Sequence, residues 1–201
     1  MPSSQHFNAS VTSQNWQPVL ETARLALREL TEADAAALLR LYREPSVERF
    51  LGPAPASEAD EEANIRRHRA DYYETRGFGL WAVTFRATPQ QLVGRCGLLV
   101  STVAGRAEVE MSWVTTPAHQ GRGVATEAAA AIRDHAANAL GQKRLVAVIA
   151  PDNAASIRVA EKLAMSRMPD VHYKTFGRVY LYVWEPDHAR ERALQLPKDR
   201  D

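Results

Sequence analysis

Hydrophobic and polar positions along this chain follow two periodicities, and each predicts a different kind of element. Runs that alternate with a period of two, or that are short and continuously apolar, are typical of strands. Such runs cover residues 24–29, 77–86, 92–100, 107–115, 145–149, 165–173 and 178–184. The run at 145–149 is apolar throughout, which predicts a strand that is buried on both faces.

Helical periodicity predicts four helices. They cover residues 31–42, 57–75, 123–140 and 153–163. Thr31 and Asp34 have the spacing of a capping box, and Pro45 is expected to stop the first helix. Gly141 follows the third helix at the position where glycine commonly ends a helix.

The connections between the strands are marked by turn residues. Thr-Pro-Gln-Gln at 88–91 predicts a turn between two strands, and a tighter break falls at 104–106. The chain of 201 residues suits one well-cored domain. We therefore expect a domain over 19–186, with a polar extension at 1–18 and a polar tail at 187–201.

Composition excludes several classes of function. The formal net charge is +1 and the basic residues are scattered among acids, which gives no support for a nucleic-acid surface. The single Cys96 lies in an apolar run, so we expect a buried, inert thiol. The six histidines have no metal-ligand spacing. No apolar run has the length of a membrane span, and no secretory signal is visible, so a cytoplasmic protein with no bound metal is expected.

The most informative segment joins a predicted strand to the alanine-rich helix. Gly121 and Gly123 leave the backbone bare where the helix begins, and Gln120 and Arg122 flank them. Unpaired amides and the positive end of the helix dipole converge at such a junction and favour an anion. A P-loop would need Lys-Ser or Lys-Thr after the second glycine, and a dinucleotide fold would need a third glycine at position 126. Neither is present.

The run from Gln120 to Ala125 matches the Q/R-x-x-G-x-G/A signature of the GCN5-related N-acetyltransferases (GNAT). Three further landmarks appear in the order that this family has: 21–28 at the start, 91–97 in mid-sheet and 151–159 near the end. The chain most resembles the branch that includes the Rim-type ribosomal-protein N-terminal acetyltransferases. The resemblance implies an α/β (α+β) fold: a mixed, largely antiparallel sheet, helices on both faces and a splayed pair of parallel strands.

The resemblance also implies a substrate pair and a binding site. Acetyl-CoA would be the acyl donor, and the acceptor would be a primary amine on a protein N-terminus or a small molecule. The enzyme would be a monomer or a homodimer. The pyrophosphate would lie on the glycine loop, and the pantetheine arm between the central strand and the next. The implied cofactor-binding residues are Val114, Thr115, Gln120, Gly121, Arg122, Gly123, Val124, Ala125, Thr126, Asn153 and Ser156.

Two residues are predicted to carry the chemistry. Period-two alternation places Glu108, Glu110 and Ser112 on one face of a central strand. The family's proton-accepting glutamate falls on Glu110, whereas Glu108 is expected to be a solvated strand carboxylate or a salt-bridge partner. The tyrosine that many members use as general acid is replaced by Ala160, so Ser156 becomes the candidate for stabilising the leaving thiolate.

Two features of the later helix leave local alternatives open. Asn153 is predicted either to contact the pantetheine arm or to have a local role, in which Asp152 or Asn153 is the N-cap and Ser156 supports the first turn. Ala164 stands where the family has a glycine. Because alanine adopts a left-handed turn with difficulty, the turn at this point is expected to differ.

Two other classes of function remain open on the sequence. A non-catalytic acyl-CoA-binding regulatory module would keep the glycine motif without turnover. A nucleotide-binding regulatory domain would bind ADP-ribose or NAD in place of CoA.

Overall fold

The computed structural model describes residues 17–173 and 176–186. Most of the expected extension at 1–18 and the whole expected tail at 187–201 lie outside these residues. The strands are β1 Leu20–Glu21, β2 Leu25–Glu29, β3 Leu80–Phe85, β4 Thr88–Val103, β5 Arg106–Thr115, β6 Leu145–Ile149, β7 Ser166–His172 and β8 Arg178–Trp184. The α-helices are α1 Ala35–Tyr42, α2 Pro45–Leu51, α3 Glu58–His68, α4 Glu74–Arg76, α5 Val124–Asn138 and α6 Ala154–Lys162.

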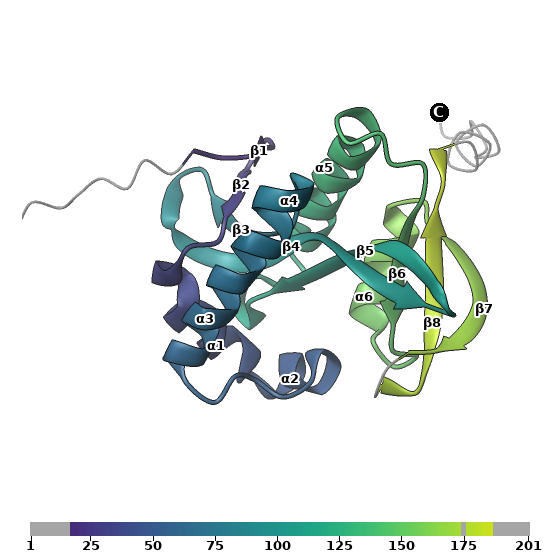
Figure 1. Cartoon of the computed structure of the whole chain (residues 1–201), viewed down its shortest axis with the longest axis horizontal. Coiled ribbons are helices and arrows are strands. Elements are labelled where there is room, and N and C mark those ends of the chain that lie inside the picture. Colours follow the sequence, from purple (N-terminus) through teal and green to yellow (C-terminus); the bar gives the residue numbers. More distant parts are fainter. Residues whose placement is uncertain (1–16, 174–175, 187–201) are drawn as a thin grey trace, which may run out of the picture.

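The strands form an open sheet in the order β1-β2-β3-β4-β5-β6-β8-β7 (Figure 1). Every neighbouring pair is antiparallel except β5 and β6. That parallel pair is joined in register only at Glu110 and Val146. The expected fold class, a largely antiparallel mixed sheet with one splayed parallel pair, is confirmed.

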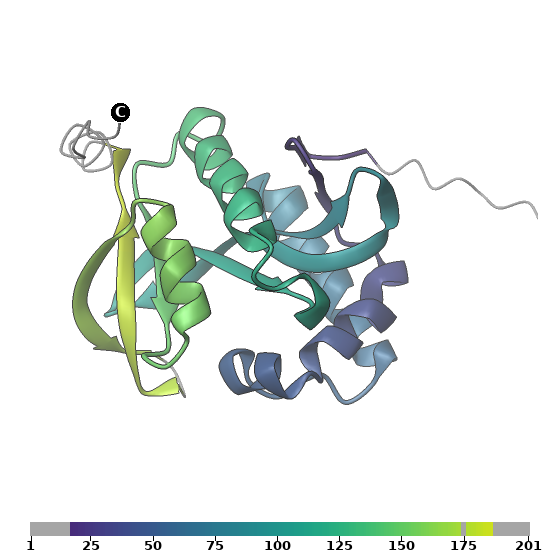
Figure 2. The same cartoon turned by 180° about the vertical axis from the view of Figure 1, so that it is seen from behind.

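Helices cover both faces of the sheet because side chains alternate along each strand. On β3, Trp81 and Val83 join the core beneath α5 and α6, whereas Leu80 and Ala82 pack with α1 and α3. Figure 1 shows α3 and α4 in front of the sheet, and Figure 2, the view from behind, shows α5 and α6 in front of it. The sheet therefore has two separate apolar faces, and the end of β5 lies between their helices.

A buried ion pair ties β2 to the start of the first helical segment. The Arg28 guanidinium donates to both carboxylate oxygens of Asp34, over 2.8 and 2.7 Å. Asp34 also accepts from the backbone N–H of Thr31, which confirms the capping box. Losing one partner of such a pair costs about 3–5 kcal/mol, because a buried charge is left uncompensated. The second arginine of the 21–28 landmark therefore has a structural role.

Pro45 begins a helix that the sequence reading missed. Helix α1 ends at Tyr42, as expected, but Pro45 then occupies the first turn of α2. Proline is well suited to that position, because the first N–H of a helix has no intrahelical partner and the ring presets φ. The following loop carries Gly52 with a positive φ of 88°. The segment after Pro45 thus folds back as a short helix at the rim of the sheet.

The prediction of a turn at residues 88–91 is also wrong. The chain reverses at 86–87, and β4 begins at Thr88. One step along β3, from Thr84 to Phe85, corresponds to four steps on β4, from Leu92 to Thr88. The additional residues on β4 form a bulge. A bulge leaves residues out of the hydrogen-bond ladder, so it can accommodate a proline such as Pro89 within the strand.

Ala164 adopts the left-handed conformation that the sequence reading expected it to avoid. Its φ is 59°. The turn therefore keeps its shape although glycine is absent, and the Met165 N–H donates to Ala160 O at 3.1 Å. Because Met165 is fully buried, packing of the chain that follows α6 holds this conformation against its local cost.

Candidate active site

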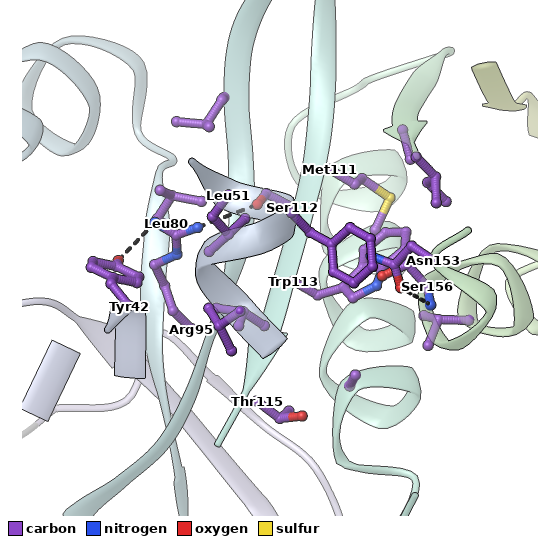
Figure 3. A pocket seen from close by; sticks show the side chains of 18 of the residues that line it. Tyr42, Leu51, Leu80, Arg95, Met111, Ser112, Trp113, Thr115, Asn153 and Ser156 are labelled. Carbon is purple, nitrogen blue, oxygen red and sulfur yellow. Dashed lines mark hydrogen bonds between the residues drawn. The ribbon is translucent and has the colours of Figure 1, made fainter. Parts of the chain in front are cut away.

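A cavity of about 890 Å³ opens where β5 and β6 separate. It is lined by the end of β5, by the glycine loop and the start of α5, by the loop and first turn of α6, and by α1 to α3. In Figure 3, Ser112 lies on one side of this space, and Trp113, Asn153 and Ser156 lie on the other. The structure thus brings the predicted catalytic and cofactor residues to one cavity. Arg122 is the exception among them, since it is not part of the lining.

Glu110 is held by a residue that the sequence reading missed. Its carboxylate is buried, and its Oε2 accepts from the Tyr173 hydroxyl at 2.6 Å. Tyr173 follows β7, and its hydroxyl also lies 3.2 Å from Ser101 Oγ on β4. The sequence carried no signal for this contact, which joins positions 63 residues apart. The phenol fixes one carboxylate oxygen and leaves the second oxygen for another partner.

The glycine loop leaves the first turn of α5 without a side-chain cap. Gly123 is the N-cap residue, with a φ of 77°, and Gly121 also has a positive φ of 71°. Glycine adopts this conformation without the strain that a Cβ imposes. Val124, Ala125 and Thr126 therefore present first-turn amides at the cavity, together with the positive end of the helix dipole. This arrangement suits a phosphate group.

The loop is anchored by the first part of the 21–28 landmark, from the turn between β1 and β2. The Arg24 guanidinium donates to the Arg122 carbonyl at 3.2 and 3.3 Å, and its Nε donates to Glu127 Oε2 at 2.7 Å. Glu127 lies in the first turn of α5 and also accepts from the Thr22 hydroxyl at 2.6 Å. The backbone of Arg122 is thus tied to the segment that carries Arg24.

The two predicted residues of α6 differ in what the structure assigns to them. Asn153 is the N-cap, and its Oδ1 accepts from the Ser156 N–H at 3.1 Å. The local, capping interpretation of Asn153 is therefore correct, although the residue also borders the cavity. Ser156 lines the cavity from the first turn. Ala160, at the position of the family's general-acid tyrosine, is fully buried in the core and has no group that could donate a proton.

The far side of the cavity carries an arginine on β4. Arg95 Nη1 donates to the Tyr42 hydroxyl at 2.8 Å, and Nη2 approaches Ser112 Oγ at 3.4 Å (Figure 3). The Arg95 Nε is buried and has no hydrogen-bond partner. Burial raises the pKa of the Tyr42 hydroxyl, which keeps it neutral beside the guanidinium. Neither of these two hydrogen bonds was predicted from the sequence.

Two other titratable groups near the site are held in their neutral forms. Burial, with a smaller contribution from Arg95, lowers the pKa of His68 to about 4. Its Nε2 accepts from the Leu80 N–H at 2.8 Å, which requires that nitrogen to be unprotonated. Burial raises the pKa of the Cys96 thiol to about 12. The expectation of a buried Cys96 is confirmed, its raised pKa disfavours the reactive thiolate, and His68 is unprotonated near neutral pH.

Glu108 has the structural role that the sequence reading favoured. Its two carboxylate oxygens accept from Arg144 Nε at 3.1 and 3.2 Å. Arg144 bridges in turn to Glu185 at 2.7 Å. Within residues 17–173 and 176–186, no cluster of three or more His, Cys, Asp or Glu side chains could hold a metal ion. No helix in that part of the chain is long and apolar enough to cross a bilayer.

Comparison with known proteins identifies the family. A family model described as acetyltransferase (GNAT) domain matches residues 24–166. The chain belongs to the GNAT family. It is an acetyltransferase, and neither the non-catalytic module nor the nucleotide-binding domain gains support.

Relatives in sequence and structure agree with this assignment. The uncharacterized N-acetyltransferase YoaA of Bacillus subtilis is 30% identical over 151 residues, which cover 75% of this chain and 84% of that protein. The crystal structure of an acetyltransferase from Agrobacterium tumefaciens is 27% identical with a TM-score of 0.70, over 84% of this chain and 95% of that one. The RimL alpha-N-protein acetyltransferase in complex with coenzyme A is similar in fold, with a TM-score of 0.70 at 16% identity, over 86% and 99%.

Proposed function

We propose that this enzyme transfers the acetyl group of acetyl-CoA directly to a primary amine, with Glu110 as the general base. The observation that carries the proposal is the position of Glu110. Its buried carboxylate lies where β5 and β6 separate, in the same cavity as the uncapped start of α5. A pyrophosphate on that helix would let the pantetheine arm run through the gap toward Glu110.

The residues suit the steps of a direct transfer. The amine proton passes through a water molecule to Glu110, and the freed nitrogen pair attacks the thioester carbonyl. The C–S bond then breaks as the adduct collapses, the nitrogen loses its second proton to give a neutral amide, and CoA leaves as a thiolate that takes up a proton. Ser156 stands on the opposite wall of the cavity and is the proposed hydrogen-bond donor to that sulfur. The Cys96 thiol, with its raised pKa, takes no part, so no acyl-enzyme is formed.

The backbone supplies the remaining contacts in this proposal. The amides of Gly121 to Thr126 and the side chain of Gln120 would hold the pyrophosphate. Gln120 Nε2 donates to the Thr115 carbonyl at 3.3 Å, so this side chain links the end of β5 to the loop. Val114 and Thr115 would offer main-chain groups to the pantetheine amides, and Asn153 would contribute through the cap that orders the start of α6.

A glutamine substitution at Glu110 tests the proposal. Glu110→Gln keeps the shape of the side chain and a hydrogen bond from Tyr173, but it cannot accept the amine proton. We expect turnover to fall about 10²- to 10⁴-fold, the usual range for loss of a general base, with acetyl-CoA affinity unchanged. Thiol release measured with a panel of amines reports turnover, and calorimetry reports affinity.

Glu108→Gln is the matched control, because Glu108 lies on the same face of β5 but pairs with Arg144. It should lose some stability and keep its turnover number. Wild-type turnover in Glu110→Gln would refute the assignment of the base.

A further inference from the structure

The cavity holds a second charged group that the acetyl-transfer chemistry does not use. Arg95 projects from β4 toward the side of the cavity walled by α1 and α3, and its hydrogen bonds go to the neutral hydroxyls of Tyr42 and Ser112. No carboxylate of the described residues lies within ion-pairing distance of its guanidinium. Its Nε, buried and without a partner, remains a donor that is not used.

Other charges around Arg95 do not neutralise it. Glu61 on α3 interacts with Arg95 through charge alone, and its side chain accepts from Asn64 at 3.2 Å instead. Burial raises the pKa of the Glu61 carboxyl, because it disfavours the charged form. Asp71 also borders the cavity, and His68 is neutral near pH 7 because its pKa is about 4. A partly buried guanidinium without an anionic partner is costly, and a ligand anion would remove that cost.

The register of the sheet places this cation within reach of the proposed base. Arg95 pairs with Val114, and its guanidinium extends along the strand to Ser112, which is two residues from Glu110 on the same face. Two residues of a strand span about 6.6 Å. A relay of two hydrogen bonds through one water covers about 5–6 Å between a carboxylate oxygen and an amine nitrogen. An amine facing Glu110 therefore has room for a carboxylate a few bonds away that faces Arg95.

We infer that the acceptor is a small amine that carries a carboxylate, such as a free amino acid, and that Arg95 binds this carboxylate. The inference rests on the proposed function and deepens it. A guanidinium presents its N–H groups in a fork that matches the two oxygens of a carboxylate. The residue that bears the N-terminal amine of a protein has a neutral amide carbonyl in place of this carboxylate, which makes a weaker partner for the guanidinium.

Acceptors that differ only in the carboxylate test this inference. For each of several side chains, the full-length enzyme receives the amino acid, its amide and its decarboxylated amine, with acetyl-CoA, and thiol release is measured. The wild type should prefer the amino acid by about tenfold or more in kcat/KM, since hydrogen bonds to charged groups have this size. Arg95→Gln should abolish the preference, mainly through KM, and change turnover of the decarboxylated amine by less than about twofold.

Arg67→Gln is the matched control. Arg67 also borders the cavity, but its guanidinium donates a hydrogen bond to Asn64 Oδ1. This variant should keep the preference of the wild type. Equal rates for the three acceptor forms in the wild type, or an equal loss on all three in Arg95→Gln, would overturn the inference. The wild-type comparison stands even if Arg95→Gln does not fold. If no amine of any form were acetylated, the proposed function itself would fail.

Discussion

At the scale of single residues, the central feature is the contact between Glu110 and Tyr173. A carboxylate between two separating strands has freedom to rotate, and the phenol removes it by bonding one oxygen at 2.6 Å. Ser101 lies 3.2 Å from the same hydroxyl and completes a short buried chain of polar groups. A general base works best when its free oxygen is already aimed at the proton that it receives. Tyr173 is therefore proposed to position Glu110.

Tyr173→Phe removes this hydrogen bond and keeps the ring. We expect kcat to fall by about tenfold, because a hydrogen bond to a charged group has a free energy of about 1.5–3 kcal/mol. The dissociation constant of acetyl-CoA should not change. Tyr180→Phe, on the neighbouring strand and outside the cavity lining, is the control and should retain wild-type kcat. An unchanged kcat in Tyr173→Phe, measured by thiol release, would show that the contact is structural.

At the scale of elements, the ends of helices determine the site more than their lengths do. Helix α5 begins at Gly123 with no side-chain cap, so its amides stay available to a ligand. Helix α6 begins at Asn153 with its cap satisfied, so its start is rigid. The two helices flank the gap in the sheet, and each begins with N–H groups that have no partner within the helix. In α5 no side chain caps them, whereas in α6 the Asn153 side chain accepts from one of them. At the other end of α6, Ala164 holds a left-handed turn.

Ala164→Gly should stabilise the protein. At a φ of 59°, alanine is strained and glycine is not, so the substitution relieves about 1 kcal/mol, reduced by the greater entropy that glycine gives the unfolded chain. The net gain in the free energy of unfolding should be about 0.5 kcal/mol, measured by chemical denaturation. Ala160→Gly, inside the same helix, should instead lose about 1 kcal/mol. A lower free energy of unfolding in Ala164→Gly would mean that packing of the Ala164 methyl group stabilises the protein by more than the strain costs.

At the scale of the whole molecule, the cavity is assembled from segments that are remote in the chain. The turn between β1 and β2 anchors the glycine loop through Arg24, 98 residues from Arg122, and the first turn of α5 through Thr22, 105 residues from Glu127. Helices α1 to α3 cover the side of the cavity that holds Arg95, and α6 with the β6–β8 strands forms the opposite wall (Figures 1 and 2). A ligand that spans the gap should therefore connect the two halves of the sheet.

Acetyl-CoA should stabilise the folded protein by mass action. At 100 times its dissociation constant, a ligand that binds only the folded state adds about 2.7 kcal/mol. The melting temperature should therefore rise with acetyl-CoA concentration. Gly123→Glu should remove this rise, because its side chain adds a negative charge at the start of α5 and its Cβ is strained at a φ of 77°. Gly141→Ala, at another positive-φ glycine remote from the cavity, controls for the backbone strain. A normal ligand shift in Gly123→Glu would place the cofactor elsewhere.

The sequence alone determined the features that depend on neighbours in the chain. Alternation along β5 put Glu110 and Ser112 on one face, and the Thr31–Asp34 spacing predicted a capping box that is present. The paired glycines predicted an uncapped helix start. Each of these rests on interactions within one or two turns or strand steps, so the local order of residues is enough to specify it.

The tertiary structure decided what depends on topology. Pro45 starts α2, where the sequence indicated only that the preceding helix would end, and Ala164 turns left-handed because the buried chain beyond it requires this. The contact of Tyr173 with Glu110 and the exposure of Arg95 to the cavity follow from strand order and from the gap between β5 and β6. A one-dimensional pattern shows which face a side chain takes. It does not show which distant segment packs against that face, because that choice is made by the packing of the whole chain.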